Sequence, residues 1–283
     1  MSSDREIFIN SSVGGNRIAI VENHELTELF IDSSEHRRMV GSIYKGRVQN
    51  VIPGMQAAFV DIGYELNSFL PFSEIGNTDN LKNLSFDEDD DKKKVNKKPK
   101  ASYKDLKVND DILVQVIKEP FSGKGPRVTT DISIPGSLMV LVPNENYIGI
   151  SRKIKDKYEK RRLRKIAETL KPEGFGLIIR TIAEGLEEEK LKADYSRVWK
   201  TWKLVESKSK TKKSPYVVYR DFDTSEQVVR DLFTSDISNL YIDDKTIYKK
   251  IRKYLKELNH ERIQNLKLIP ANKYIFDTHN IEQ

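Results

Sequence analysis

MQAAFVDIG, residues 55–63, is a short apolar run that ends in glycine inside a polar, lysine-rich chain. Short apolar runs bounded by turn residues are typical of β-strands. The phenylalanine of this strand, Phe59, has two possible roles. A strand phenylalanine usually fills a core, which composition alone favours, whereas on the face of a small barrel it stacks on the bases of single-stranded nucleic acid.

Further short strands surround this run and are divided from it by Gly, Pro and Asn. They are GSIYKGRVQNVI at 41–52, NSFLPF at 67–72 and DILVQVIK at 111–118. Short strands punctuated in this way predict a small all-β barrel rather than a βαβ unit. We therefore expect a barrel over residues 40–119.

A charged segment, residues 76–108, interrupts the predicted barrel. Acidic residues 87–91 run directly into Lys92, Lys93 and Lys94, with few apolar residues around them. This composition predicts a solvated, disordered loop, because the segment has too little apolar surface to bury. A weaker alternative is that its lysines add to the attraction of RNA.

Residues 120–214 predict a separate α+β unit. Its predicted strands are RVTTDISI at 127–134, SLMVLVP at 137–143 and FGLIIRT at 175–181. Its predicted helices are IKDKYEKRRLRKIAETLK at 154–171 and LEEEKLKADYSRVWKTWKLVES at 186–207, where apolar residues recur at helical spacing. Arg180 and Thr181 end the last strand, and a guanidinium fork beside a hydroxyl suits a terminal phosphate. The common alternative is a solvated arginine.

The two ends of the chain, residues 1–39 and 215–283, each resemble half of an α/β domain. The first end predicts only strands, whereas the second alternates strand and helix. Neither end has enough elements to bury a core alone. We expect the two ends to form one split subdomain, with the units between them as inserts.

The composition excludes several classes of protein. The chain has no cysteine, which excludes disulfides and thiolate metal sites, and fits a reducing cytoplasm. It carries a formal net charge of +6, which suits a phosphate-bearing partner. The sequence has no secretory signal and no apolar segment of membrane-spanning length, so we expect a soluble, cytoplasmic protein.

No self-contained catalytic or metal site is predicted. The histidines, His24, His36, His260 and His279, share no ligand spacing. Asp61 lies inside the barrel motif, where a turn-forming role is expected, and FSGKG at 121–125 reads as a flexible turn rather than a phosphate loop.

Several motifs, in this order, carry a family resemblance. They are residues 39–75, residues 114–144 from VQVIKEP to VLVPN, GISRKI at 149–154, EGFGLIIRTIAEG at 173–185 and the weaker IFDTHNIEQ at 275–283. Together they resemble the bacterial ribonuclease E/G family, and its ribonuclease G type most. The resemblance implies an α+β multi-subdomain fold. It comprises a split RNase H-like subdomain, an inserted S1 (OB-type) β-barrel and an α+β 5′-sensor subdomain.

The resemblance also implies a set of RNA contacts. By matching motif, the S1 contacts fall on Phe59, Phe69 and Lys118, with Arg152 as a less secure contact. The 5′-phosphate site falls on Gly136, Val140, Arg180 and Thr181. For each residue a scaffold role is the alternative: Gly136 could permit a bend, and Val140 could be core.

The family's activity is Mg²⁺-dependent hydrolysis of single-stranded RNA, used to process rRNA and degrade mRNA. Its members continue into a DNase I-like subdomain that supplies two aspartates for magnesium, then into a cysteine segment that shares zinc between two protomers. Neither is found here, and Asp243 and Asp277 do not fit the catalytic pattern. We expect no catalytic residue and no confident metal site in this chain, and homo-oligomers for the complete enzyme.

Two explanations for the missing segments stay open: a fragment of a longer enzyme, or a natural truncated form. The predicted function is the RNA-binding and 5′-monophosphate-sensing portion of an endoribonuclease, with poor or no cleavage by this chain. The alternative is a non-catalytic RNA-binding S1 adaptor. An S1 protein of the translation apparatus is a weaker third option, which the context of Arg180 and Thr181 argues against.

Overall fold

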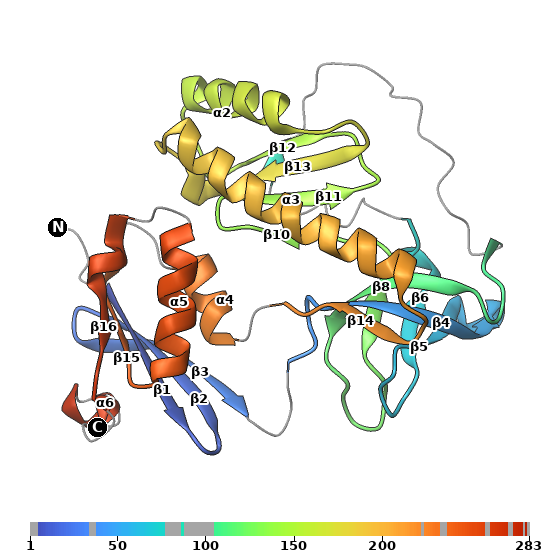
Figure 1. Ribbon diagram of the computed structural model, residues 1–283, viewed down its shortest axis with the longest axis horizontal. Helices are drawn as coiled ribbons and strands as arrows, with labels where there is room; N and C mark the ends of the chain where they lie inside the picture. The colour runs from blue at the N-terminus through green and yellow to red at the C-terminus, as the bar shows by residue number, and fades with distance from the viewer. Residues whose placement is uncertain are drawn as a thin grey trace. The chain divides into compact units, whose positions relative to one another are not determined.

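The computed structural model describes residues 5–33, 38–76, 86–87, 105–221, 224–232, 237–257, 261–270, 274–279 and 281. The chain forms two compact units (Figure 1). The first combines Met1–Arg38 with Phe222–Gln283, and the second is Met39–Asp221. Apart from residue 76, residues 86–87 and residues 105–108, the predicted disordered loop over 76–108 lies outside the described residues.

The first unit is a five-stranded sheet to which both ends of the chain contribute. From one end come β1 (Arg5–Ser12), β2 (Gly15–Glu22) and β3 (Glu25–Ser33), which pair antiparallel. From the other end come β15 (Ile237–Ile242) and β16 (Leu266–Leu268), which run parallel to β1 in the order β16-β15-β1-β2-β3. The RNase H-like identity expected for this unit stays a prediction.

Alternation along the strands divides the apolar side chains of this sheet between its two faces. Ile7 and Ile9 of β1 pack with apolar residues of α4 (Thr224–Leu232) and α5 (Lys245–Glu257). Phe8, between them, packs on the other face with α6 (Ile275–Thr278). Helices therefore cover both faces (Figure 1). A 3₁₀ turn, η5 (Glu261–Asn265), precedes β16.

The second unit begins with a barrel of five strands closed by pairing between β4 and β8. Its strands are β4 (Ile43–Ile52), β5 (Ala57–Asp61), β6 (Ser68–Pro71), β8 (Asp111–Lys118) and β9 (Arg127–Thr129), and the chain also forms 3₁₀ turns η1 (Pro53–Met55) and η2 (Phe72–Glu74) here. Alternate residues point inward, and the core includes Tyr44, Val60, Leu70 and Val114.

The rest of this unit is a second sheet with two helices. Its strands, in spatial order, are β10 (Ile134–Pro135), β11 (Met139–Pro143), β13 (Phe175–Ile179), β12 (Ile148–Ser151) and β7 (Phe86–Asp87). The helices are α2 (Lys157–Leu170) and the long α3 (Glu188–Thr211). Leu163 of α2 and Leu191 and Val198 of α3 are fully buried in the core they form with this sheet. The chain is thus a mixed α+β protein, as its sequence predicts.

The structure places two strands differently from the predicted boundaries. β9, expected in the unit over 120–214, belongs to the barrel, because the turn after β8 returns it antiparallel to β8 and beside β6. β14 (Tyr216–Tyr219), expected in the split subdomain over 215–283, pairs with β4. Its Val217 packs against the barrel core and its Val218 in the core of the second sheet, which holds it in this unit.

Candidate nucleic-acid interface

The two phenylalanines selected from the sequence face each other on the outside of the barrel. Phe59 of β5 lies directly opposite Phe69 of β6, and their ring centroids are 5.9 Å apart in an edge-to-face arrangement. Both rings are half-buried, whereas Ala58, Val60 and Leu70, which alternate with them, are fully buried in the barrel core. The rings therefore present aromatic surface to the exterior rather than fill the core.

A single register row extends this aromatic pair across all five strands. Asn50 of β4 lies opposite Phe59, Arg127 of β9 lies beside Phe69, and Lys118 of β8 lies opposite Arg127. We call Asn50, Phe59, Phe69, Arg127 and Lys118 the barrel row. It combines aromatic faces with two cations, which is the combination that binds single strands by stacking and by contact with phosphates.

Sequence reasoning missed two members of the barrel row, Asn50 and the cation Arg127. Arg127 Nη2 donates to Glu74 Oε1 over 3.0 Å, and the Glu74 side chain is only 12% exposed. This ion pair fixes the guanidinium beside Phe69. A signal was present, since Arg127 alternates with the apolar Val128 at the start of a predicted strand.

Asp61 has the turn role expected for it. Its Oδ1 accepts a hydrogen bond of 2.8 Å from the backbone amide of Gly63, which has a positive φ of 81°. Glycine adopts this conformation without steric strain. The carboxylate is thereby engaged in shaping the loop after β5.

The residues expected to grip a phosphate lie at neighbouring strand ends of the second sheet. Arg180 follows β13, and its Nη1 donates to the carbonyl oxygen of Gly136 over 3.0 Å. Thr181, at the start of the 3₁₀ turn η4 (Thr181–Ala183), shares a hydrogen bond of 2.8 Å with the hydroxyl of Ser151 at the end of β12. We call Gly136, Ser151, Arg180 and Thr181 the strand-end site.

Gly136 has no room for a side chain. A Cβ at this position would collide with Asp194 Oδ2, and would lie 2.8 Å from the carbonyl oxygen of Met139 and 2.9 Å from Val198 Cγ1. Since backbone atoms cannot yield cheaply, the position requires glycine. A scaffold role therefore operates here whether or not a ligand contacts this backbone.

Asp194 of α3, which sequence reasoning also missed, organises the loop that follows Gly136. Its carboxylate is fully buried and accepts from the backbone amides of Ser137, Leu138 and Met139 at 3.2, 2.8 and 3.2 Å. Arg197 Nη2 donates to it over 2.8 Å. Its position, on the same helical face as Leu191 and Val198, is a detectable signal, because a buried charge must be paired.

Two further predicted residues lie beside the strand-end site. Val140 is half-buried in β11, opposite Pro135 and Ile178, while Met139 and Leu141 on either side of it are fully buried. Arg152 is exposed and directly follows Ser151. The structure thus brings the predicted phosphate-binding residues to the strand ends of the second sheet. The barrel row lies on a different sheet of the same unit.

Most of the chain matches two known families in sequence. Residues 37–120 match the S1 RNA binding domain, and residues 133–283 match the Ribonuclease E/G family. The chain belongs to the ribonuclease E/G family. Within that family it is 36% identical over 280 residues to Ribonuclease G of Haemophilus influenzae, and 31% identical over 277 residues to Ribonuclease G of Escherichia coli.

Each of these alignments covers 98% of this chain and 55% of the relative, so the chain spans about half the length of the ribonucleases G that it matches. Ribonuclease E of a Nostoc species is 34% identical over 238 residues, which is 84% of this chain and 32% of the relative. The resemblance drawn from the motifs is confirmed, and the five-stranded barrel is the S1 barrel.

The magnesium implied by the ribonuclease E/G family has no matching ligand set in the described part of the chain. No group of three or more His, Asp or Glu side chains is placed there to hold a metal ion. The residues described therefore do not fit the ion. Likewise, no helix among the described residues is long and apolar enough to span a membrane.

Proposed function

We propose that this ribonuclease E/G chain binds single-stranded RNA along the barrel row. The observation that carries the proposal is the alignment of Phe59, Phe69, Arg127 and Lys118 in one register across four strands. Bases would stack on the two rings while the two cations contact the phosphates, with little dependence on sequence.

We further propose that the strand-end site recognises the 5′-monophosphate of the RNA. This proposal is supported by the position of Arg180 and Thr181, which lie close to the backbone of Gly136 and to Ser151 at neighbouring strand ends. One donor of Arg180 forms the hydrogen bond to the Gly136 carbonyl oxygen. This hydrogen bond fixes the orientation of the guanidinium before a ligand binds. When one RNA strand is bound at the barrel row or at the strand-end site, its effective concentration at the other of these two sites rises.

The complete protein is proposed to be a cytoplasmic, homo-oligomeric endoribonuclease that processes rRNA and degrades mRNA by Mg²⁺-dependent hydrolysis. This rests on the relatives named ribonuclease G and ribonuclease E. The chain described here would hold the substrate and sense its 5′ end. A nuclease assay separates this role from full activity, since efficient Mg²⁺-dependent cleavage by the pure chain would contradict a purely substrate-holding role.

The decisive experiment measures binding of short RNAs that differ only in the 5′ end: monophosphate, triphosphate or hydroxyl. The wild-type chain should favour the monophosphate, and Arg180→Ala should bind all three ends equally while keeping its affinity for the hydroxyl end. Arg161→Ala, at an exposed position of α2, is the control that loses one cation elsewhere on the same unit. Equal wild-type affinity for all three ends would contradict the proposal for the strand-end site.

A further inference from the structure

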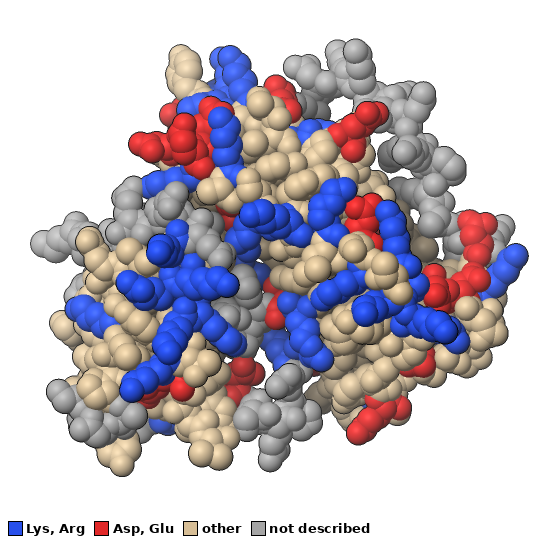
Figure 2. All heavy atoms as spheres, viewed as in Figure 1, with Lys and Arg blue, Asp and Glu red and all other residues tan. Residues whose placement is uncertain are grey.

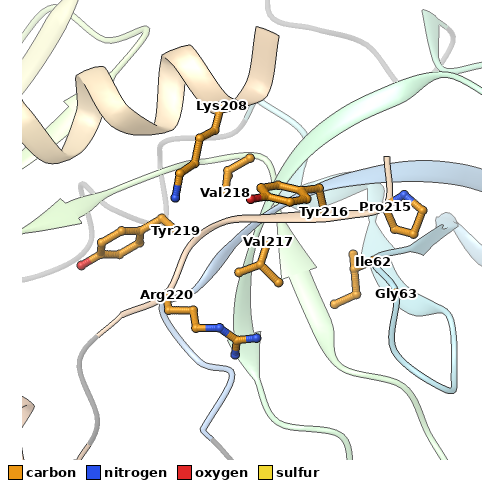
Figure 3. Close-up of a pocket in the computed structure, with 9 residues that line it drawn as sticks. All are labelled: Ile62, Gly63, Lys208, Pro215, Tyr216, Val217, Val218, Tyr219 and Arg220. Carbon is orange, nitrogen blue, oxygen red and sulfur yellow. The ribbon is translucent and has the colours of Figure 1, made fainter. Parts of the chain in front are cut away.

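An open groove of about 620 Å³ lies between the C-terminal end of α3 and the edge strand β14 (Figure 3). Ile62 and Gly63, which follow β5, line it together with residues 215–220, and Lys208 reaches it from α3. We call it the α3–β14 groove. None of its residues belongs to the barrel row or to the strand-end site.

Cations dominate the charged groups of the α3–β14 groove. Lys208 is half-buried and extends from the helix toward β14, and Arg220 is exposed at the end of that strand (Figure 3). Lys212 places its Nζ 5.6 Å from the centre of the Tyr216 ring. Figure 2 shows that Lys and Arg side chains gather over α3 and the strands next to it. Such a surface attracts a polyanion.

Two acidic residues lie near the groove. Asp221, next to Arg220 in the sequence, accepts a hydrogen bond of 3.1 Å from the Tyr219 hydroxyl, and Asp111 is paired with other cations. Lys45 Nζ lies 3.2 Å from Asp111 Oδ2, and Arg47 Nε lies 3.7 Å from Asp111 Oδ1. In the described part of the chain, Lys208 and Arg220 take part in no ion pair with a carboxylate. Their charge is therefore available to a ligand that brings its own negative charge.

The groove also offers surfaces on which a base can rest. Pro215 is exposed, and Tyr216 and Tyr219 are half-buried along the strand. Within the described residues β14 pairs only with β4, so its other edge has backbone amides and carbonyls without a neighbouring strand. Aromatic faces, backbone donors and cations together form the surface that single-stranded nucleic acid requires.

The groove continues from the barrel row along the same strands. Asn50 of the barrel row and Lys45 are five residues apart on β4, which at ~3.3 Å per residue of strand is a separation of about 16 Å. On β4, Asn50 lies opposite Phe59 and Lys45 lies opposite Tyr216. An RNA strand stacked on Phe59 and Phe69 therefore needs only a few more nucleotides to enter the groove.

We propose that the α3–β14 groove binds the sugar–phosphate backbone of the same single-stranded RNA that the barrel row holds. Lys208 and Arg220 contact its phosphates, and Pro215 and Tyr216 support its bases. This inference rests on the proposed RNA binding by the barrel row and adds a second segment to the track. An open groove with cations outside ion pairs favours a long polyanion over a small enclosed ligand.

The test measures affinity for oligouridylates of four and ten nucleotides that carry a 5′-hydroxyl, so that 5′-phosphate recognition does not contribute. The wild-type chain should bind the longer RNA more tightly. The double variant Lys208→Gln/Arg220→Gln should bind ten nucleotides about tenfold more weakly. Its salt dependence should be shallower by about 1.4 in the log–log slope, because each of the two phosphates that it no longer neutralises accounts for about 0.7. Its affinity for four nucleotides should stay within about twofold, because the short RNA occupies only the barrel row.

The matched control is Arg161→Gln/Lys165→Gln, which removes two exposed cations from α2 of the same unit. It should bind both RNAs like the wild-type chain, and circular dichroism should show all variants folded. Equal losses of affinity in the two double variants would overturn the proposal, because net charge alone would explain them. The proposal would also be overturned if the wild-type chain bound ten nucleotides no more tightly than four and Lys208→Gln/Arg220→Gln had the same affinity as the wild-type chain. A protein partner would then be the remaining candidate ligand of the groove.

Failure of the groove is distinguishable from failure of the barrel row. Phe59→Ala should weaken binding of the four-nucleotide RNA as well as the longer one. If Phe59→Ala weakens both and Lys208→Gln/Arg220→Gln weakens neither, the groove proposal fails alone. If the wild-type chain binds neither RNA, both proposals fail together.

Discussion

The carboxylate of Asp194 occupies the space that a side chain at Gly136 would need. It also accepts hydrogen bonds from the three backbone amides that follow Gly136, at 2.8–3.2 Å. One buried acid on α3 thus fixes the loop whose carbonyl orients Arg180. The geometry of the strand-end site therefore depends on α3, a helix that contributes none of the four residues of the site.

Replacement of Gly136 by alanine should disturb this contact. The added methyl group would displace Asp194 or the backbone of Met139, and overpacking of this kind costs about 1–3 kcal/mol of unfolding free energy. Urea unfolding measures the destabilisation, and RNA binding should show a weaker preference for the 5′-monophosphate. Gly54→Ala is the control, since its methyl group would meet no atom within 4 Å. Equal effects of the two substitutions would contradict the steric explanation.

Removal of the Asp194 carboxylate should destabilise the folded protein more than removal of Glu206, a half-buried acid at the surface of the same helix. Asp194→Ala leaves Arg197 and three backbone amides without this acceptor, and breaking a buried ion pair costs about 3–5 kcal/mol. Thermal unfolding should show a clear fall in midpoint. Glu206→Ala, which removes only surface ion pairs with Lys203 and Lys210, should change it little. An Asp194→Ala protein as stable as Glu206→Ala would refute this role.

The family resemblance in the sequence selected Phe59, Phe69 and Lys118, together with Arg180 and Thr181. The structure places the first three in one register row and the last two at a strand end, and their contact with RNA stays a prediction. Arg127 was missed because its place beside Phe69 depends on a pairing between β6 and β9, which are not consecutive strands. Asp194 was missed because its partners lie 55–57 residues earlier in the chain.

Dependence on long-range contacts also explains why β14 was expected in the split subdomain, although it pairs with β4 of the barrel. The sequence YVVY at 216–219 predicts a strand correctly, but its periodicity does not specify a partner strand. The choice of β4 arises from packing, because Val217 and Val218 enter two different cores of the second unit. Tertiary contacts of this kind decide strand partners, whereas composition decides only that a strand forms.

Truncation of either aromatic residue of the barrel row should weaken RNA binding. Phe59→Ala and Phe69→Ala should each cost roughly 1–3 kcal/mol of binding free energy, the usual contribution of one stacked base. Fluorescence anisotropy with a short oligouridylate measures it. Tyr158→Ala, which removes an aromatic side chain that is 81% exposed on α2, is the control. If all three variants bind like the wild-type chain, the barrel row is not the RNA surface.

The pH dependence of stability should carry a contribution from Glu159. A bidentate hydrogen bond from Arg162, aided by the backbone amide of Gly185, holds the pKa of Glu159 below its ordinary value of 4.5. A lowered pKa in the folded state stabilises the protein above the unfolded pKa. That stabilisation disappears as the pH falls through the folded value.

Urea unfolding at pH values of about 7, 5 and 3 tests this contribution. Glu159→Gln should be less stable than the wild-type chain at the two higher values, and the difference should shrink at the lowest. Glu168→Gln, at an exposed position of the same helix, should show a smaller difference at neutral pH. A deficit of Glu159→Gln that is equally large at all three pH values would contradict the explanation.

The position of β1 between β2 and β15 has a consequence for synthesis on the ribosome. β1 ends at Ser12, but its parallel neighbour begins at Ile237, so the ribosome must add more than two hundred residues before that neighbour exists. At ~5–20 residues per second the interval is roughly 10 to 45 seconds. During this time β1 has an unpaired edge that could pair with another nascent chain. Translation speed should therefore influence the yield of folded protein, and slow translation should favour aggregation.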